Sequence, residues 1–388
     1  DVYKRQSVYC VVFTEPAGEP KGAFRFVQGQ KIRSVGAGDE FCDDCLRINR
    51  VAEAVICNHE NFLLNRRLML QLPGNFFIIV IIQTNRENIL SENNYRDNRG
   101  GIILDRKVML TADSTCDLNK ELMQRYHVKT YPLHIVLGGK SFEDSVNIMP
   151  DEIYDNFYKT GELPKTSAIN AGEYIDAFRP FIEQGYEIVH INIGSALSGS
   201  HQNCVTAAKE LGHVYPVDSC NLSSGTGLLV IEAAQRIAQG MDARQTAQEV
   251  QALTAKSHAS FIIDRLDFMR AGGRCSTVTM LGANLLNLKP CIEVDNEHGG
   301  AMGVGKKYRG KLEKVLQNYV EEKLAQYGNI RTDRIFITHS GISKEREQMV
   351  YDLLKSKNYF KEILITRASC TISSHCGPNT LGILFMTE

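Results

Sequence analysis

The chain has 388 residues, of which 43% are hydrophobic and 23% are charged, and its formal net charge is −1. At about 150 residues per domain, this length predicts two to three globular domains with apolar cores of their own. The balanced charge, the 8% aromatic content and the lack of Trp argue against nucleic-acid binding, which needs a basic surface or aromatic stacking platforms.

The cysteines and the apolar runs indicate where in the cell the protein is located and whether it binds a metal or spans a membrane. Eleven cysteines, scattered along the chain, favour reduced thiols and therefore a cytoplasmic protein. Cys42 and Cys45 form one C-x-x-C pair without a second pair at zinc spacing, so we expect no metal site and no cofactor. Residues 76–82 are an apolar run far shorter than the ~20 residues of a membrane span, and they predict a buried strand or an aggregation-prone segment. Residues 1–20 lack the basic-then-apolar order of a signal peptide.

Residues 1–106 and 107–388 differ in character. The first part shows no clear alternation of strands and helices, and residues 83–100 are polar and rich in Asn, which is typical of a linker. We interpret residues 1–106 as an N-terminal extension that is either a small appended domain or a non-native or disordered segment.

From Lys107 onward, strands alternate with helices at the spacing of parallel β-α-β units. This pattern predicts an α/β domain with an open, mostly parallel sheet over residues 107–259. We expect strands at 107–112, 129–137, 187–193 and 214–217, one helix ending at 126, and helices at 151–158, 172–184, 198–211, 227–238 and 243–255.

Residues 260–388 predict a second α/β domain with mixed strand directions. A strand at 259–263 precedes a hairpin of residues 285–294 and 302–308, and a helix at 311–327 leads to strands at 334–338 and 362–366. Residues 300–306, in the hairpin, have the glycine and lysine spacing of a Walker A loop. Because Lys307 stands where Ser or Thr should bind magnesium, we expect no nucleotide site there.

Four clusters of hydroxyl side chains follow strands and precede helices in the first of these domains, at residues 113–115, 164–167, 194–200 and 218–225. In an open α/β sheet such turns lie at the carboxyl ends of strands, where ligands bind. Hydroxyls and free N–H groups at helix N-termini suit an anion such as a carboxylate, although any one cluster is also typical of helix capping. Four clusters in one domain favour a polar binding site.

Ser198 resembles the nucleophile of a strand-to-helix elbow. Such a serine needs a histidine and an acid as partners, and His339 and His375 both follow later strands. The glycines of the G-x-S-x-G pattern are absent, so a serine hydrolase built on Ser198 and His375 is the alternative hypothesis and not the leading one.

Two further residues are candidates for ligand contact. Arg274 ends the tight turn 271–274 after a short helix, where its guanidinium either pairs with a carboxylate or is an ordinary surface cation. His375 lies in residues 373–378, which we expect to form an irregular polar turn between two strands.

In order and spacing, these segments resemble the DegV family of bacterial lipid-binding proteins. The resemblance covers residues 107–388 and does not reach residues 1–106. It rests on residues 113–118, 165–167, 195–200, 217–219, 224–229, 266–274, 289–290 and 375–382.

The resemblance implies a two-domain α/β protein that binds one long-chain fatty acid between its domains. It also implies a carrier without catalytic activity of its own, which presents the carboxylate to a separate ATP-binding fatty acid kinase subunit that forms the acyl phosphate. The residues that the resemblance assigns to ligand binding are Thr166, Ser167, Ser198, Gly199, Arg274 and His375, with Arg309 near the head group or the kinase partner.

An alkyl tail gains roughly 0.8 kcal/mol per buried CH₂, so a tunnel can hold it through apolar surface alone. Candidate tunnel residues, which otherwise belong to the core, are Phe261, Ile262 and Ile263, and Met280 and Leu281 with Leu285 and Leu286. Cys376 and His201 stand where the family commonly has Thr and Tyr. The sequence therefore leaves open the acyl-chain preference, and also a carrier of another amphiphile without a kinase partner.

Overall fold

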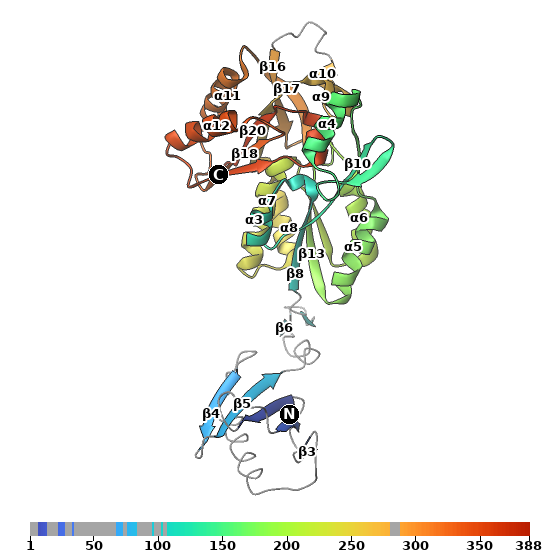
Figure 1. The fold of residues 1–388 in the computed structure, drawn as a ribbon, viewed down its shortest axis with the longest axis vertical. Helices are drawn as coiled ribbons and strands as arrows, with labels where there is room; N and C mark the ends of the chain where they lie inside the picture. Colours follow the sequence, from blue (N-terminus) through green and yellow to red (C-terminus); the bar gives the residue numbers. More distant parts are fainter. Residues whose placement is uncertain are drawn as a thin grey trace. The chain divides into compact units, whose positions relative to one another are not determined.

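The computed structural model describes the backbone of residues 107–279 and 288–388 and of seven strands before them (Figure 1). The chain forms two compact units, Asp1–Asp105 and Arg106–Glu388. In the first unit, one sheet has the order β3-β2-β1-β5-β4 and a second sheet pairs β6 with β7. These strands are β1 (Ser7–Phe13), β2 (Gly22–Val27), β3 (Arg33–Ser34), β4 (Arg67–Leu72), β5 (Phe76–Gln83), β6 (Tyr95–Arg96) and β7 (Ile102–Ile103). The strand predicted at 76–82 is confirmed as β5, whereas Cys42 and Cys45 lie outside the described residues.

The second unit contains the parallel sheet that the alternation of strands and helices predicts. Its elements are β8 (Lys107–Asp113), α3 (Lys120–Arg125), β9 (Lys129–Tyr131), α5 (Ala171–Glu183), β13 (Tyr186–Asn192), α6 (Ser200–Leu211), β14 (Val214–Asp218), α7 (Ser223–Ala238) and α8 (Ala243–Ala252). The strands are all parallel, in the order β14-β13-β8-β9. Because side chains alternate between the faces of a strand, Val189 and Ile191 pack with α7 while Ile188 packs with α5 and α6. In Figure 1, α7 and α8 lie on one side of β8 and β13, and α5 and α6 lie on the other.

A six-stranded mixed sheet follows, as expected for the C-terminal part. Its elements are β15 (Ser257–Ile262), α9 (Leu266–Gly272), α10 (Ser276–Thr279), β16 (Leu288–Asp295), β17 (Ala301–Arg309), α11 (Leu312–Gln326), β18 (Arg334–His339), α12 (Lys344–Ser356), β19 (Glu362–Arg367), α13 (Cys370–Cys376) and β20 (Leu381–Met386). The order is β17-β16-β15-β20-β18-β19, in which β18 and β19 are parallel and the other pairs antiparallel. The hairpin is confirmed as β16 and β17. The domain boundary at 259 and 260 stays a prediction, and β15 spans it.

A third sheet, not predicted from the sequence, is antiparallel and has the order β11-β10-β12. It comprises β10 (His134–Leu137), β11 (Lys140–Glu143) and β12 (Lys165–Ser167), and α4 (Pro150–Thr160) lies between β11 and β12 in the chain. The single strand predicted at 129–137 is therefore wrong. Between β9 and β10 stands Pro132, which lacks the backbone N–H that a continuing strand would donate.

Two further elements correct the sequence prediction. Residues 370–376 form helix α13, so His375 lies in the last turn of a helix and not in an irregular turn. Helix α7 begins at Ser223, four residues before the predicted start. In its first turn, the Ser224 hydroxyl lies 2.7 Å from that of Thr338 on β18. This long-range partner stabilises a Ser- and Gly-rich helix start whose intrinsic propensity is poor.

Candidate functional site

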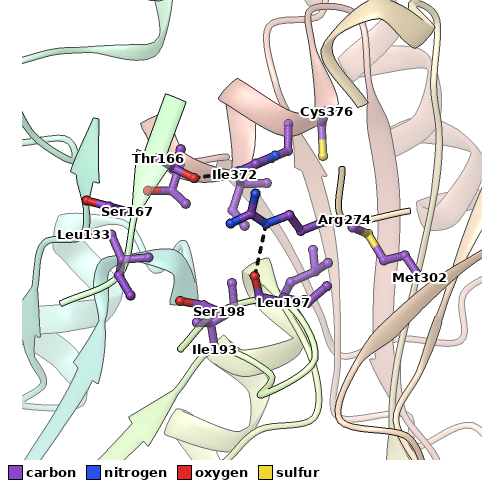
Figure 2. Close-up of a pocket in the computed structure, with 14 residues that line it drawn as sticks. Leu133, Thr166, Ser167, Ile193, Leu197, Ser198, Arg274, Met302, Ile372 and Cys376 are labelled. Carbon is purple, nitrogen blue, oxygen red and sulfur yellow. Dashed lines mark hydrogen bonds between the residues drawn. The ribbon is translucent and has the colours of Figure 1, made fainter. Parts of the chain in front are cut away.

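A cavity with about 490 Å³ of space not filled by atoms lies in the second unit, where loops of the parallel sheet meet the small sheet, α13 and β17 (Figure 2). Its polar lining is Thr166, Ser167, Ser198, Arg274, Thr371 and His375. Its apolar lining is Leu133, Ala168, Ile193, Leu197, Leu222, Met302, Ile372 and Cys376. The cavity therefore combines a few hydroxyl, imidazole and guanidinium groups with a mostly apolar wall, which is the composition of a small-molecule site.

Thr166 and His375 form the closest polar pair of this cavity. Thr166 lies on β12, where it is opposite Ile135 of β10, and its Oγ1 is 2.8 Å from Nε2 of His375. Burial, together with the charge of Arg274, lowers the pKa of His375 to about 4, so the ring is neutral near pH 7. When Nε2 carries the proton, His375 donates to Thr166, and the hydroxyl proton of Thr166 is then available to an acceptor in the cavity.

The other ring nitrogen of His375, Nδ1, is packed closely against Gly272. Nδ1 is buried and has no hydrogen-bond partner among the described residues. A Cβ on Gly272 would lie 2.0 Å from it, far inside van der Waals contact. Gly272 is therefore needed for the close approach of the α9 end to the imidazole.

Ser198 and Arg274 complete the polar side of the cavity. Ser198 lies in the turn between β13 and α6, where its Oγ accepts from the N–H of Ser200 at 3.2 Å. Arg274 donates from Nε to the Leu197 carbonyl at 3.3 Å (Figure 2) and from its Nη1 to the Gly272 carbonyl at 2.7 Å. Its guanidinium thus ties the Ser198 turn to the end of α9 across the cavity wall.

The structure brings five predicted residues to this one cavity: Thr166, Ser167, Ser198, Arg274 and His375. Gly199 lies beside it, in an open recess that shares Leu197, Ser198, Arg274 and Met302 with the cavity. Arg309 is exposed at the end of β17, opposite Leu288, and is not among the lining residues.

The hydroxyl clusters divide into two groups. Residues 164–167 and 194–200 contribute to the cavity, although Thr166 belongs to a strand and not to a turn before a helix. The clusters at 113–115 and 218–225 are mostly buried and bonded inside the protein. Two of the four clusters therefore contribute to the polar cavity, whereas the other two connect structural layers.

Thr371 is a candidate that the sequence did not single out. It lies one helical turn before His375 on α13, lines the cavity, and its buried Oγ1 has no partner among the described residues. A buried hydroxyl without a partner costs free energy, so a ligand acceptor would satisfy it. Sequence reasoning missed Thr371 because residues 370–376 were not predicted to form a helix, so its position one turn before His375 could not be recognised.

No hydrogen bond joins Ser198 to His375 among the described contacts, since the imidazole bonds Thr166 and the Ser198 hydroxyl lies 3.0 Å from that of Ser200. No carboxylate of the described residues orients the free Nδ1 of His375. The base and the orienting acid that a serine nucleophile needs are thus not assembled.

A second cavity, with about 310 Å³ of space that is not filled by atoms and is partly open to solvent, shares Leu222, Ile372 and Cys376 with the first. Phe261, a predicted tunnel residue, lines it together with Ala368 and Leu384. Ile262 and Ile263 are core residues. The other predicted tunnel residues, at 280–281 and 285–286, lie outside the described residues.

Comparison with known proteins gives the family. The profile of DegV, described as an uncharacterised protein family, matches residues 107–388. The chain belongs to the DegV family. A DegV domain-containing protein of Clostridium perfringens is 27% identical over 290 residues, which cover 73% of this chain and 99% of the relative.

Solved DegV structures share the fold. A Thermus thermophilus DegV family protein, described by its fatty acid binding, is 27% identical with a TM-score of 0.66, covering 73% of this chain and 100% of that one. A fatty acid binding DegV protein of Streptococcus agalactiae is 24% identical with a TM-score of 0.65, covering 73% and 99%, and supports the fold alone. These comparisons confirm the predicted DegV resemblance and its α/β architecture.

The described residues contain no group of three or more His, Cys, Asp or Glu side chains arranged to hold a metal ion. Among the same residues, every helix is too short or too polar to span a bilayer.

Proposed function

We propose that this DegV protein binds one long-chain fatty acid with its carboxylate at Thr166, Ser198 and His375. The observation that carries the proposal is the meeting of these donors with Arg274 at the polar side of an otherwise apolar cavity. The Thermus thermophilus relative, described as fatty acid binding, supports the same ligand class.

The carboxylate needs several donors because burial of an unpaired charge is very costly. Thr166 donates its hydroxyl proton while His375 bonds its oxygen from behind, and Ser198 donates from the facing turn. Ser167, and the backbone of Gly199 in the adjoining recess, complete the surroundings. Arg274 lowers the electrostatic cost of the negative head group, although its guanidinium also bonds two carbonyls.

The alkyl tail leaves the polar side and runs along the shared residues Leu222, Ile372 and Cys376 into the second cavity. Each CH₂ taken out of water contributes roughly 0.8 kcal/mol. The affinity for such a ligand therefore grows with the number of CH₂ groups that are buried, and polar contacts are needed only at the carboxylate.

The carrier performs no chemistry on the ligand. It presents the carboxylate to a separate ATP-binding kinase subunit, which forms the acyl phosphate, and the exposed Arg309 contributes to that partner's docking. The proposal includes a cytoplasmic location, which seven free cysteines in the described part of the chain support.

Native mass spectrometry of the purified chain, followed by lipid extraction, tests the ligand. One fatty acid per chain supports the proposal and names the tail. A protein that is empty and also takes up no added oleate contradicts it.

The kinase step needs its own test. The loaded protein, a dihydroxyacetone-kinase-like ATP-binding subunit from the same organism and ATP are mixed with hydroxylamine, which traps an acyl phosphate as its hydroxamate. Hydroxamate formation that depends on all three components supports the carrier role, and its absence with a kinase active on another DegV protein contradicts it.

A further inference from the structure

The segment Asp113–Asp117 lines none of the three cavities described above, and the proposed function gives it no role. Its side chains are nevertheless polar and deeply placed, with Asp113 fully buried and Asp117 only 4% exposed. Buried polar groups of this kind need partners. Asp113 bonds core residues such as Tyr174 and His190, but several other partners of the segment lie in the parts of the chain that build the fatty-acid cavity.

Ser114 begins a chain of hydrogen bonds that ends at α13. Its Oγ donates to Oδ2 of Asp144 at 2.9 Å. The carboxylate of Asp144, which is 1% exposed, accepts the backbone N–H of Cys370 at 2.6 Å and that of Thr371 at 3.2 Å. Asp144 therefore caps the first turn of α13 from a distant part of the chain.

Asp117 supports the same helix end. One of its carboxylate oxygens accepts the backbone N–H of Ser369 at 2.9 Å, the residue just before α13. Its other oxygen accepts the hydroxyl of Ser223 at the start of α7. Two buried carboxylates thus fix where this seven-residue helix begins.

The same segment also reaches the other cavity walls. Asp113 accepts the backbone N–H of Ile193 at 2.9 Å, at the start of the turn that carries Ser198. The Ser114 hydroxyl accepts the N–H of Leu133 at 3.2 Å, and Leu133 lines the cavity. The segment is thus bonded to three cavity-lining parts without contacting the cavity itself.

We infer that Ser114 and Asp144 are positioning residues that hold α13, and with it Thr371 and His375, against the fatty-acid cavity. The inference rests on the proposed function for its effect on binding. Its structural part, the placement of the His375 ring, is independent of any ligand.

The test compares Ser114→Ala, Asp144→Asn and the conservative Ser114→Thr with the wild-type chain. Oleate affinity is measured by calorimetry, and the ring signals of His375 are followed in ligand-free protein labelled with ¹⁵N-histidine and assigned with His375→Gln. Loss of one buried hydrogen-bond partner predicts roughly tenfold weaker oleate binding and shifted His375 signals for the first two variants. Ser114→Thr, which keeps the hydroxyl, restores both.

Asp242→Ala is the matched control, because Asp242 caps α8 by accepting the N–H of Gln245 at 2.8 Å and is remote from the cavity lining. It lowers the melting temperature with unchanged oleate affinity. Folded Ser114→Ala and Asp144→Asn proteins that keep wild-type affinity and unshifted His375 signals would overturn the inference. If Asp144→Asn does not fold, Ser114→Ala decides alone. If the wild type binds no fatty acid, the proposed function fails, and the ligand-free His375 signals still decide the positioning role.

Discussion

Thr166 Oγ1 and His375 Nε2 lie 2.8 Å apart although 209 residues separate them in the chain. The bond joins β12 of the small antiparallel sheet to α13, which follows β19 of the mixed sheet in the chain. The polar side of the cavity therefore forms only when these two parts are packed together. Any change that separates them should cost fatty-acid affinity.

Replacing Thr166 by Val tests the hydroxyl with little change of shape. We expect roughly 10- to 100-fold weaker oleate binding, because a hydrogen bond to a charged group contributes about 1.5–3 kcal/mol. Calorimetric titration with oleate measures the change. Thr206→Val is the control, since Thr206 is exposed on α6 and bonds only the Gln202 carbonyl. Equal affinity of Thr166→Val and wild type would exclude the hydroxyl as a ligand donor.

Gly272→Ala tests the steric support of His375. Its new methyl group would lie 2.0 Å from Nδ1, so the imidazole must move and its bond to Thr166 must lengthen. We expect a destabilisation of about 1–3 kcal/mol, seen in chemical denaturation, together with weaker oleate binding. Gly328→Ala, where a Cβ meets no atom within 4 Å, should change neither. If Gly272→Ala binds oleate as wild type does, the imidazole position does not matter for the ligand.

The parts of the site that the sequence could predict are those with local signals. Ser198 stands at a strand-to-helix turn and Arg274 follows a helix stop, so both could be placed from neighbouring residues alone. The alternation of apolar strands and amphipathic helices likewise predicted β8, β13 and β14, because each buries a face against its own flanking helices.

The missed parts depend on distant partners. Helix α13 contains Cys, Thr, Ser and His, which are weak helix formers, and its N-terminus is capped by Asp117 and Asp144, more than 220 residues away. Thr166 was placed in a turn because β12 is only three residues long and gains its stability by pairing with β10. Neither the capping of α13 by distant carboxylates nor the pairing of β12 with β10 can be recognised from residues that are neighbours in the sequence.

Acid should destabilise the protein through His375. Its folded pKa is lowered to about 4 by burial, below the ordinary 6.5, so the unfolded chain binds a proton that the folded chain rejects. This contribution to stability is complete above pH 6.5 and is lost as the pH falls toward 4. At about pH 4.5 the loss amounts to roughly 2–3 kcal/mol.

The comparison that isolates this effect is wild type against His375→Gln, by urea denaturation from about pH 7 to 4.5. The advantage of the wild type should shrink as the pH falls. Burial raises the pKa of Asp117 to about 7 and lowers the pKa of His339 to about 4. Both residues are present in wild type and variant, so their contributions to the pH dependence of stability cancel in the difference. A difference that stays constant with pH would mean that His375 titrates normally.

Filling the second cavity should shorten the acyl chain that the protein accepts. Ala368 is 2% exposed and lines that cavity, and its N–H donates to the His339 carbonyl through the backbone, which a substitution preserves. In Ala368→Leu the added carbons occupy space proposed for the tail end. If about three CH₂ groups lose their burial, stearate binding weakens by roughly 2 kcal/mol, or about thirtyfold.

Decanoate, whose tail is shorter, should bind Ala368→Leu and wild type alike, so the ratio of the two affinities is the measured quantity. Ala252→Leu, at the exposed end of α8, should leave both affinities unchanged. Equal weakening of stearate and decanoate would indicate a general distortion near α13, since both ligands share only the head group and the first cavity. Unchanged binding of both would mean that the tail takes a route other than the one past Leu222, Ile372 and Cys376.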